Sequence, residues 1–211
     1  MRSADVATLI RTFMVFLVVY MLLLKINPWV TIFVILIMYL LDGFDGYLAI
    51  RSASRGAISF SSYLKAALSK DEKEKEKMAH FKQIAKREAR FGPRIDIAGD
   101  RVIEYTFWIV FTYLRLIPLF VVFIVIFRHA FVDALMAARG TSSKPRTKFA
   151  KIIYASNIGR GGINVVKFLA FAYLVLVYVS NYPLWIGLVI VAILVIYIVM
   201  RGIAEAYDVL A

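Results

Sequence analysis

Four aspartates form two closely spaced pairs, and their geometry suits the binding of a cation. Asp42 and Asp45 are three residues apart, and Asp96 and Asp100 are four residues apart. On a helix both spacings put two side chains on one face, so each pair presents its carboxylates together. The chain has no cysteine and only two histidines, so oxygen atoms are the available ligands. Sites built from oxygen alone favour Mg²⁺, Mn²⁺ or Ca²⁺.

Glycines and arginines flank both aspartate pairs, and together with a metal they suggest a bound phosphate or diphosphate. The glycines leave room for a bulky ligand to approach the backbone; they are Gly43, Gly46, Gly92 and Gly99. A simpler interpretation treats the aspartates as interfacial carboxylates that pair with nearby arginines, namely Arg51, Arg94 and Arg101. That interpretation suits any single aspartate, whereas the joint spacing of all four favours the metal site.

The elements that must position these aspartates are membrane helices. The 211 residues are 62% hydrophobic and 19% charged, which excludes an ordinary soluble enzyme and a disordered chain. A helix needs about 20 apolar residues to cross a bilayer, and six spans are expected, at residues 7–24, 28–48, 97–113, 117–138, 163–180 and 184–200. The predicted fold class is therefore an all-α integral membrane protein, with residues 1–211 forming a single six-helix membrane domain.

The distribution of basic residues predicts how these helices are oriented. Residues 51–94 hold twelve lysines and arginines, and residues 139–167 hold seven. The positive-inside rule places both segments, and hence both termini, on the cytoplasmic side of a cell membrane. The net charge of +12 then reflects topology and attraction to anionic lipid headgroups. No nucleic-acid partner is expected, because no recognition module accompanies the charge.

The two aspartate pairs resemble the signature of the CDP-alcohol phosphotransferase family, which reads D-x-x-D-G-x-x-A-R and then G-x-x-x-D-x-x-x-D. The first half matches at Asp42, Asp45, Gly46 and Ala49, and the second matches at Gly92, Asp96 and Asp100. The arginine stands one place late, as Arg51. The halves are separated by about forty residues rather than the family's eight, so residues 52–90 are predicted to form a cytoplasmic helical insertion.

The resemblance implies roles for these residues and for the partners of the chain. Asp42, Asp45, Asp96 and Asp100 would ligate two divalent ions, Mg²⁺ or Mn²⁺, and Asp100 would also take the proton of the acceptor hydroxyl. A CDP-linked lipid would be bound by Thr8, Asp45, Gly46, Ala49, Arg51 and Gly92. The active site would lie at the cytoplasmic edge of the bilayer, and the protein would be a homodimer.

The insertion and the second basic segment carry further predictions. Ile58, Phe60, Tyr63, Leu64, Ala67 and Leu68 form an apolar stripe of the kind found in interfacial helices. With the alternating charges that follow, a solvated helical hairpin is the favoured interpretation of this segment, and an anchor on the lipid surface or a gate over the active site are the alternatives. Residues 128–136 resemble the fourth helix of phosphatidylglycerophosphate synthases. This likeness implies a phosphorylated acceptor bound by cations, for which Lys148, Lys151, Arg160 and Arg201 are available.

The predicted reaction is transfer of a phosphatidyl group, or of its ether-lipid analogue, from the CDP-linked lipid to a polyol phosphate, with release of CMP. Glycerol 3-phosphate is the expected acceptor, and an inositol phosphate acceptor, as in phosphatidylinositol phosphate synthases, is the alternative within the family. An alternative of another class is a cation-coupled transporter whose aspartates coordinate the translocated ion. A transporter is expected to place such groups near the midplane, often within internal repeats.

Overall fold

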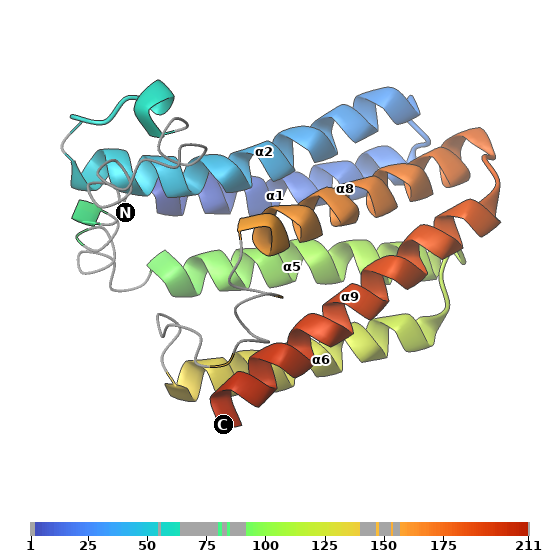
Figure 1. Cartoon of the computed structure of the whole chain (residues 1–211). Coiled ribbons are helices and arrows are strands. Elements are labelled where there is room, and N and C mark those ends of the chain that lie inside the picture. Colours follow the sequence, from blue (N-terminus) through green and yellow to red (C-terminus); the bar gives the residue numbers. More distant parts are fainter. Residues whose placement is uncertain are drawn as a thin grey trace. The chain divides into compact units, whose positions relative to one another are not determined.

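The computed structural model describes residues 3–54, 56–63, 80–81, 84, 92–139, 147, 153 and 157–210. Long helices account for nearly all of these residues (Figure 1). They are α1 (Ser3–Leu23), α2 (Pro28–Ala53), α5 (Gly92–Tyr113), α6 (Leu119–Arg139), α8 (Asn157–Ser180) and α9 (Leu184–Leu210). The predicted all-α membrane fold class is confirmed.

Five of the six expected spans are long and apolar enough to cross a membrane: α1, α2, α6, α8 and α9. The exception is α5, which has 22 residues but carries Arg94, Asp96, Asp100, Arg101 and Glu104. The sixth span therefore stays a prediction. Many large apolar side chains are exposed on the other helices, including Phe13, Phe123 and Ile193. Such surfaces are expected where helices face lipid rather than water.

Tight turns join α1 to α2, α5 to α6 and α8 to α9. Lys25, Arg115 and Asn181 each have positive φ angles, of 49°, 59° and 56°, so each takes the left-handed conformation that ends a helix. After α1 the amide of Lys25 donates to the carbonyl of Leu22. Asn27 then caps α2, because its side chain accepts a hydrogen bond from the amide of Trp29 at 3.0 Å. Pro28, which lacks an amide hydrogen, occupies the first position of that helix.

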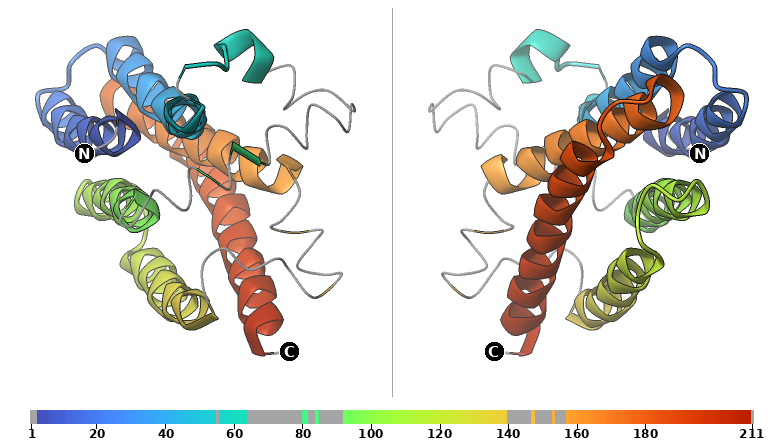
Figure 2. Two further views of the ribbon diagram at one scale, coloured as in Figure 1. Left: turned by 90° about the vertical axis from the view of Figure 1, so that its left-hand side faces the viewer. Right: turned by 90° about the vertical axis from the view of Figure 1, so that its right-hand side faces the viewer.

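The helices divide into two compact units. The N-terminal unit comprises Met1–Val18 and Val34–Glu104, and the C-terminal unit comprises Val19–Phe33 and Tyr105–Ala211. Within the C-terminal unit, α9 packs against α6 and α8 (Figure 2). The core of this unit is aromatic. The ring of Phe171 on α8 packs against three rings of α5, with centroids 4.7 to 5.8 Å from its own: Phe107, Trp108 and Phe111.

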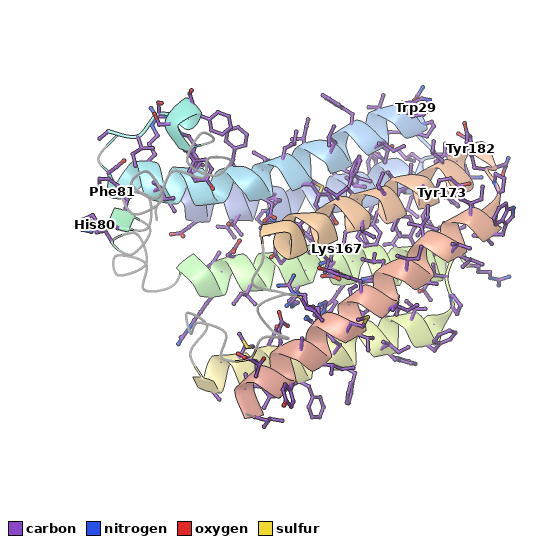
Figure 3. The ribbon with its side chains drawn as sticks, viewed as in Figure 1. Trp29, His80, Phe81, Lys167, Tyr173 and Tyr182 are labelled. Atoms are coloured by element: carbon purple, nitrogen blue, oxygen red, sulfur yellow. The ribbon has the colours of Figure 1, made fainter. Side chains whose placement is uncertain are left out.

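The turn between α8 and α9 is also stabilised by aromatic residues. Tyr173 and Tyr182 lie together there, with their rings edge to face at 6.3 Å (Figure 3). The hydroxyl of Tyr173 donates a hydrogen bond to the carbonyl of Pro183. Gly187 lets α9 approach α8 closely, because a Cβ there would lie 3.2 Å from the ring of Tyr173.

Candidate metal centre

Gly99 brings α5 into close contact with α1. A Cβ at Gly99 would lie 2.8 Å from both the Oγ1 of Thr12 and the Cγ2 of Thr8, which is closer than real side chains approach. The Thr12 hydroxyl is itself fixed by a 2.8 Å hydrogen bond to the carbonyl of Thr8. The expectation that Gly99 leaves room for a ligand is therefore wrong, since α1 fills the space. The residue serves helix packing, and it lies beside Asp100.

Arg11 is the residue of α1 that reaches the aspartates. Its side chain is only 5% exposed, and its guanidinium contacts carboxylates on two other helices. Nη1 donates to Oδ1 of Asp42 on α2. Nη2 lies 2.9 Å from Oδ1 of Asp100 and 3.3 Å from Oδ1 of Asp96, both on α5. The sequence prediction did not assign a role to this arginine, although a charged residue inside an apolar span was the signal available.

Three of the four predicted metal ligands converge. One carboxylate oxygen from each of Asp42, Asp96 and Asp100 lies within 4.8 Å of the others. Oxygens on opposite sides of one ion are about 4.2 Å apart around Mg²⁺ and about 4.6–5.2 Å apart around Ca²⁺. The three carboxylates could therefore hold a divalent cation with little movement. Asp45 lies on α2 one turn after Asp42, but its side chain is outside the part of the chain that the structure describes.

The predicted lipid-binding residues have different surroundings. Thr8 is buried against Gly99, next to Arg11. Arg51 is nine residues from Asp42, which at 100° per residue puts it on the opposite side of α2. Its guanidinium lies 6.0 Å over the ring of Tyr47. Ala49 lies on α2, while the surroundings of Gly46 and Gly92 are outside the described residues.

The start of the insertion folds back onto α2 through aromatic contacts. Phe60 stacks on Phe44 at 4.9 Å and meets Tyr47 edge to face at 5.2 Å. Tyr63 packs on Tyr47 at 5.6 Å, and burial raises the pKa of its hydroxyl above the ordinary value. Of the three residues, Ile58 is buried, Tyr63 is half-buried and Phe60 remains 38% exposed despite its ring contacts. The rest of the stripe, Leu64, Ala67 and Leu68, lies outside the described residues.

A second charged cluster lies in the C-terminal unit and includes Arg201, one of the predicted acceptor-binding cations. Arg201 Nε donates to Oε1 of Glu205 at 2.9 Å, and Arg128 Nη2 donates to Oε2 of the same carboxylate at 2.5 Å. All three side chains are largely buried. Gly202 makes room for Arg128, because a Cβ there would lie 2.7 Å from the Cγ of that arginine. Two guanidinium groups therefore share one carboxylate.

The end of α9 also anchors one residue of the second basic segment. Asp208 is fully buried and accepts hydrogen bonds from the Thr147 amide at 2.7 Å and from its hydroxyl at 3.1 Å. Asp208 is not among the predicted site residues. Lys148 and Lys151, two of the predicted acceptor-binding cations, lie outside the described residues, and so does the side chain of Arg160.

Comparison with known proteins finds a family model that matches the N-terminal part of the chain. No curated protein and no solved structure matches the chain. One family model matches residues 1–55, a segment that contains Arg11, Asp42 and Asp45 and ends before α5. The contacts of Arg11 with Asp96 and Asp100 connect the second aspartate pair to this segment. The matching model is that of the CDP-alcohol phosphatidyltransferases, and residues 1–55 of this chain are similar to that family.

Proposed function

We propose that the protein is a CDP-alcohol phosphatidyltransferase that transfers a phosphatidyl group, or its ether-lipid analogue, from a CDP-linked lipid to a polyol phosphate. The single observation that carries the proposal is the convergence of Asp42, Asp96 and Asp100 from two helices. Asp42 belongs to the segment that matches the family. The match supports a transferase of this kind, and glycerol 3-phosphate is the acceptor we favour over an inositol phosphate.

Asp42, Asp45, Asp96 and Asp100 are the residues that would hold two Mg²⁺ or Mn²⁺ ions. Bound there, the ions would neutralise the diphosphate of the donor and stabilise the entering and leaving oxygens of an in-line displacement. The helices of the protein would hold these carboxylates close together. The contact between α1 and α5 at Gly99 supports this role, because it fixes the helix that carries Asp96 and Asp100.

In the proposed reaction the acceptor hydroxyl attacks the phosphorus on the lipid side of the diphosphate. A bond forms between the hydroxyl oxygen and that phosphorus, and the bond from the phosphorus to the oxygen of CMP breaks. Asp100 takes the hydroxyl proton, and CMP leaves with the bridging oxygen. An ordinary aspartate has a pKa near 3.9, so the hydroxyl must be made more acidic before Asp100 can accept its proton. The half-exposed side chain of Asp100 is accessible to an acceptor from solution.

The phosphate of the acceptor is proposed to bind to Arg201, Lys148, Lys151 and Arg160. For Arg201 the supporting observation is its partnership with Arg128 on the single carboxylate of Glu205. Guanidinium groups bind phosphates through charge-assisted hydrogen bonds, and the Arg201 side chain is 24% exposed and so accessible to one. We further propose that the protein works as a homodimer, with residues 1–211 forming one membrane domain and residues 52–90 a cytoplasmic insertion.

The function is tested by measuring CMP release from CDP-diacylglycerol by the purified protein in detergent with Mg²⁺. Glycerol 3-phosphate, inositol phosphate and serine are compared as acceptors, and Asp96→Asn is the control. Release that depends on glycerol 3-phosphate and is lost in Asp96→Asn would support the proposal. Release with inositol phosphate alone would favour the alternative acceptor. Absence of release with all three acceptors, from folded protein that still binds Mn²⁺, would contradict the proposed reaction and point to another acceptor or to an enzyme that has lost its activity.

The proposed cytoplasmic orientation has a direct test because the natural chain has no cysteine. Single cysteines placed at Lys70 or Lys144 would be the only thiols available to a membrane-impermeant maleimide. We expect no labelling in intact cells and full labelling in inverted vesicles. The reverse pattern would show that both basic segments lie outside.

A further inference from the structure

Arg11 is a buried charge in the middle of the proposed metal site. It lies on one face of α1 with Thr8 and Thr12, and the other charged residue of this helix is Asp5 in its first turn. A charged side chain inside a membrane helix is unfavourable unless it finds partners. Here the partners are three carboxylates, those of Asp42, Asp96 and Asp100.

The contacts of Arg11 use the carboxylates that would bind a cation. Both Nη atoms of the guanidinium are engaged, Nη1 with Asp42 and Nη2 with Asp96 and Asp100. In each case the partner atom is Oδ1. An ion at ordinary distance from the Asp100 oxygen would lie within a few ångströms of Nη2. Two positive charges that close repel strongly in a partly buried site, so the guanidinium and the ion oppose each other.

We propose that Arg11 is the resident counter-cation of the metal-free site. It holds the carboxylates of α2 and α5 together before a divalent ion binds, and it gives up contacts when the ion arrives. Arg11 therefore stabilises the metal-free protein and lowers its affinity for the ion. The inference rests on the proposed metal site, and it assigns a positioning role to Arg11.

The test is Mn²⁺ binding to the full-length protein in detergent, measured by calorimetry or by the paramagnetic resonance of free Mn²⁺. Arg11→Met keeps most of the side-chain volume and removes the charge, and Arg11→Lys keeps the charge. We expect Arg11→Met to bind Mn²⁺ roughly tenfold more tightly than the wild type, because a repelling charge is gone. Arg11→Lys should bind within about threefold of the wild type. Arg115→Met, at the exposed turn after α5, is the matched control for the loss of one positive charge and should leave the affinity unchanged.

Thermal melting gives a second readout that does not depend on activity. In EDTA, Arg11→Met should melt below the wild type, because three carboxylates are left without their guanidinium. Saturating Mn²⁺ should raise its melting temperature by more than it raises that of the wild type. If Arg11→Met does not fold in EDTA, folding restored by Mn²⁺ would support the proposal, with Arg11→Gln as a second neutral variant.

The outcomes separate this inference from the proposed function. Unchanged or weaker Mn²⁺ binding by folded Arg11→Met would overturn it and make Arg11 a permanent support of the site. Neutral variants that fail to fold even with Mn²⁺ would overturn it as well, since the ion would then be unable to replace the guanidinium. A wild type that binds no Mn²⁺, or that binds it no better than Asp96→Asn, would instead overturn the metal site itself, and the inference with it.

Discussion

Substitution of Gly99 by alanine tests whether the contact between α1 and α5 positions the aspartates. The added Cβ would lie 2.8 Å from atoms of both Thr8 and Thr12, whereas ordinary contacts are about 3.5–4.0 Å. One helix must therefore shift by about 0.7 Å or more. Overpacking of this kind costs about 1–3 kcal/mol, and alanine recovers up to about 1 kcal/mol of helix propensity. The expected net destabilisation is about 0–2 kcal/mol.

The effect on activity is expected to exceed the effect on stability. Asp100 follows Gly99 directly, and Asp96 lies one turn earlier on the same helix. A displacement of about 1 Å at reacting groups can reduce a rate about a hundredfold. We therefore expect Gly99→Ala to lose between about tenfold and a hundredfold of its CMP release, with a small fall in melting temperature. Both quantities are measured on the same detergent-purified sample.

Two further variants make this reasoning refutable. Gly43→Ala adds the same methyl group to α2 at a position with no atom within 4 Å, so it should keep or raise the melting temperature. Combining Gly99→Ala with Thr8→Ser and Thr12→Ala removes the two atoms that the new Cβ would meet, and this should restore much of the stability. Wild-type activity and stability in Gly99→Ala alone would refute the close approach of α1 and α5. A defect that the combined variant does not relieve would show that crowding is not its cause.

The charged cluster of the C-terminal unit leads to three more predictions, each measured by thermal melting. Glu205→Gln should destabilise the protein by about 3–5 kcal/mol, because it removes the carboxylate that both largely buried guanidinium groups contact; an unchanged melting temperature would contradict the ion pairs. Gly202→Ala should lower stability as well. Its Cβ would displace the aliphatic part of the Arg128 side chain, while the guanidinium of Arg128 is hydrogen-bonded to Glu205. Thr147→Val should cost about 1 kcal/mol through the lost hydroxyl hydrogen bond to Asp208, while Thr147→Ser should not.

Much of the fold could be predicted because its signals are local. The length of each apolar run predicts a membrane helix, and the residues at the joins, such as Asn27-Pro28, predict where the helices begin and end. The helix α5 is less predictable, since its first half carries charges that lower its hydropathy. Two of those charges, Asp96 and Asp100, contact Arg11 on α1, and pairing between distant residues is invisible in a hydropathy pattern.

The candidate site could be predicted only where its signals are local in the sequence. The i, i+3 and i, i+4 spacings reveal that each aspartate pair shares a helix face, and the convergence of Asp42 with Asp96 and Asp100 agrees with that. The role of Arg11 depends on which face of α1 meets the other helices, and no spacing within α1 reveals it. The surroundings of Gly99 are likewise a property of two helices together, which is why a ligand was expected where α1 packs.

The two compact units contain a similar arrangement of an arginine, its carboxylate partners and a glycine. In each, an arginine on one helix reaches carboxylates on another: Arg11 reaches Asp42, Asp96 and Asp100, and Arg128 reaches Glu205. A glycine lies on the carboxylate-bearing helix in both cases, and its missing Cβ allows the close approach of Thr8 and Thr12 at Gly99 and of Arg128 at Gly202. The numbers of charged groups differ, however. Three carboxylates contact one guanidinium in the first unit, whereas two guanidinium groups contact one carboxylate in the second. In the proposed transfer to a phosphorylated alcohol, the carboxylates would hold metal ions and the guanidinium groups would bind the acceptor phosphate. Glu205→Gln with acceptor-dependent CMP release as the readout tests whether the second cluster takes part in that reaction.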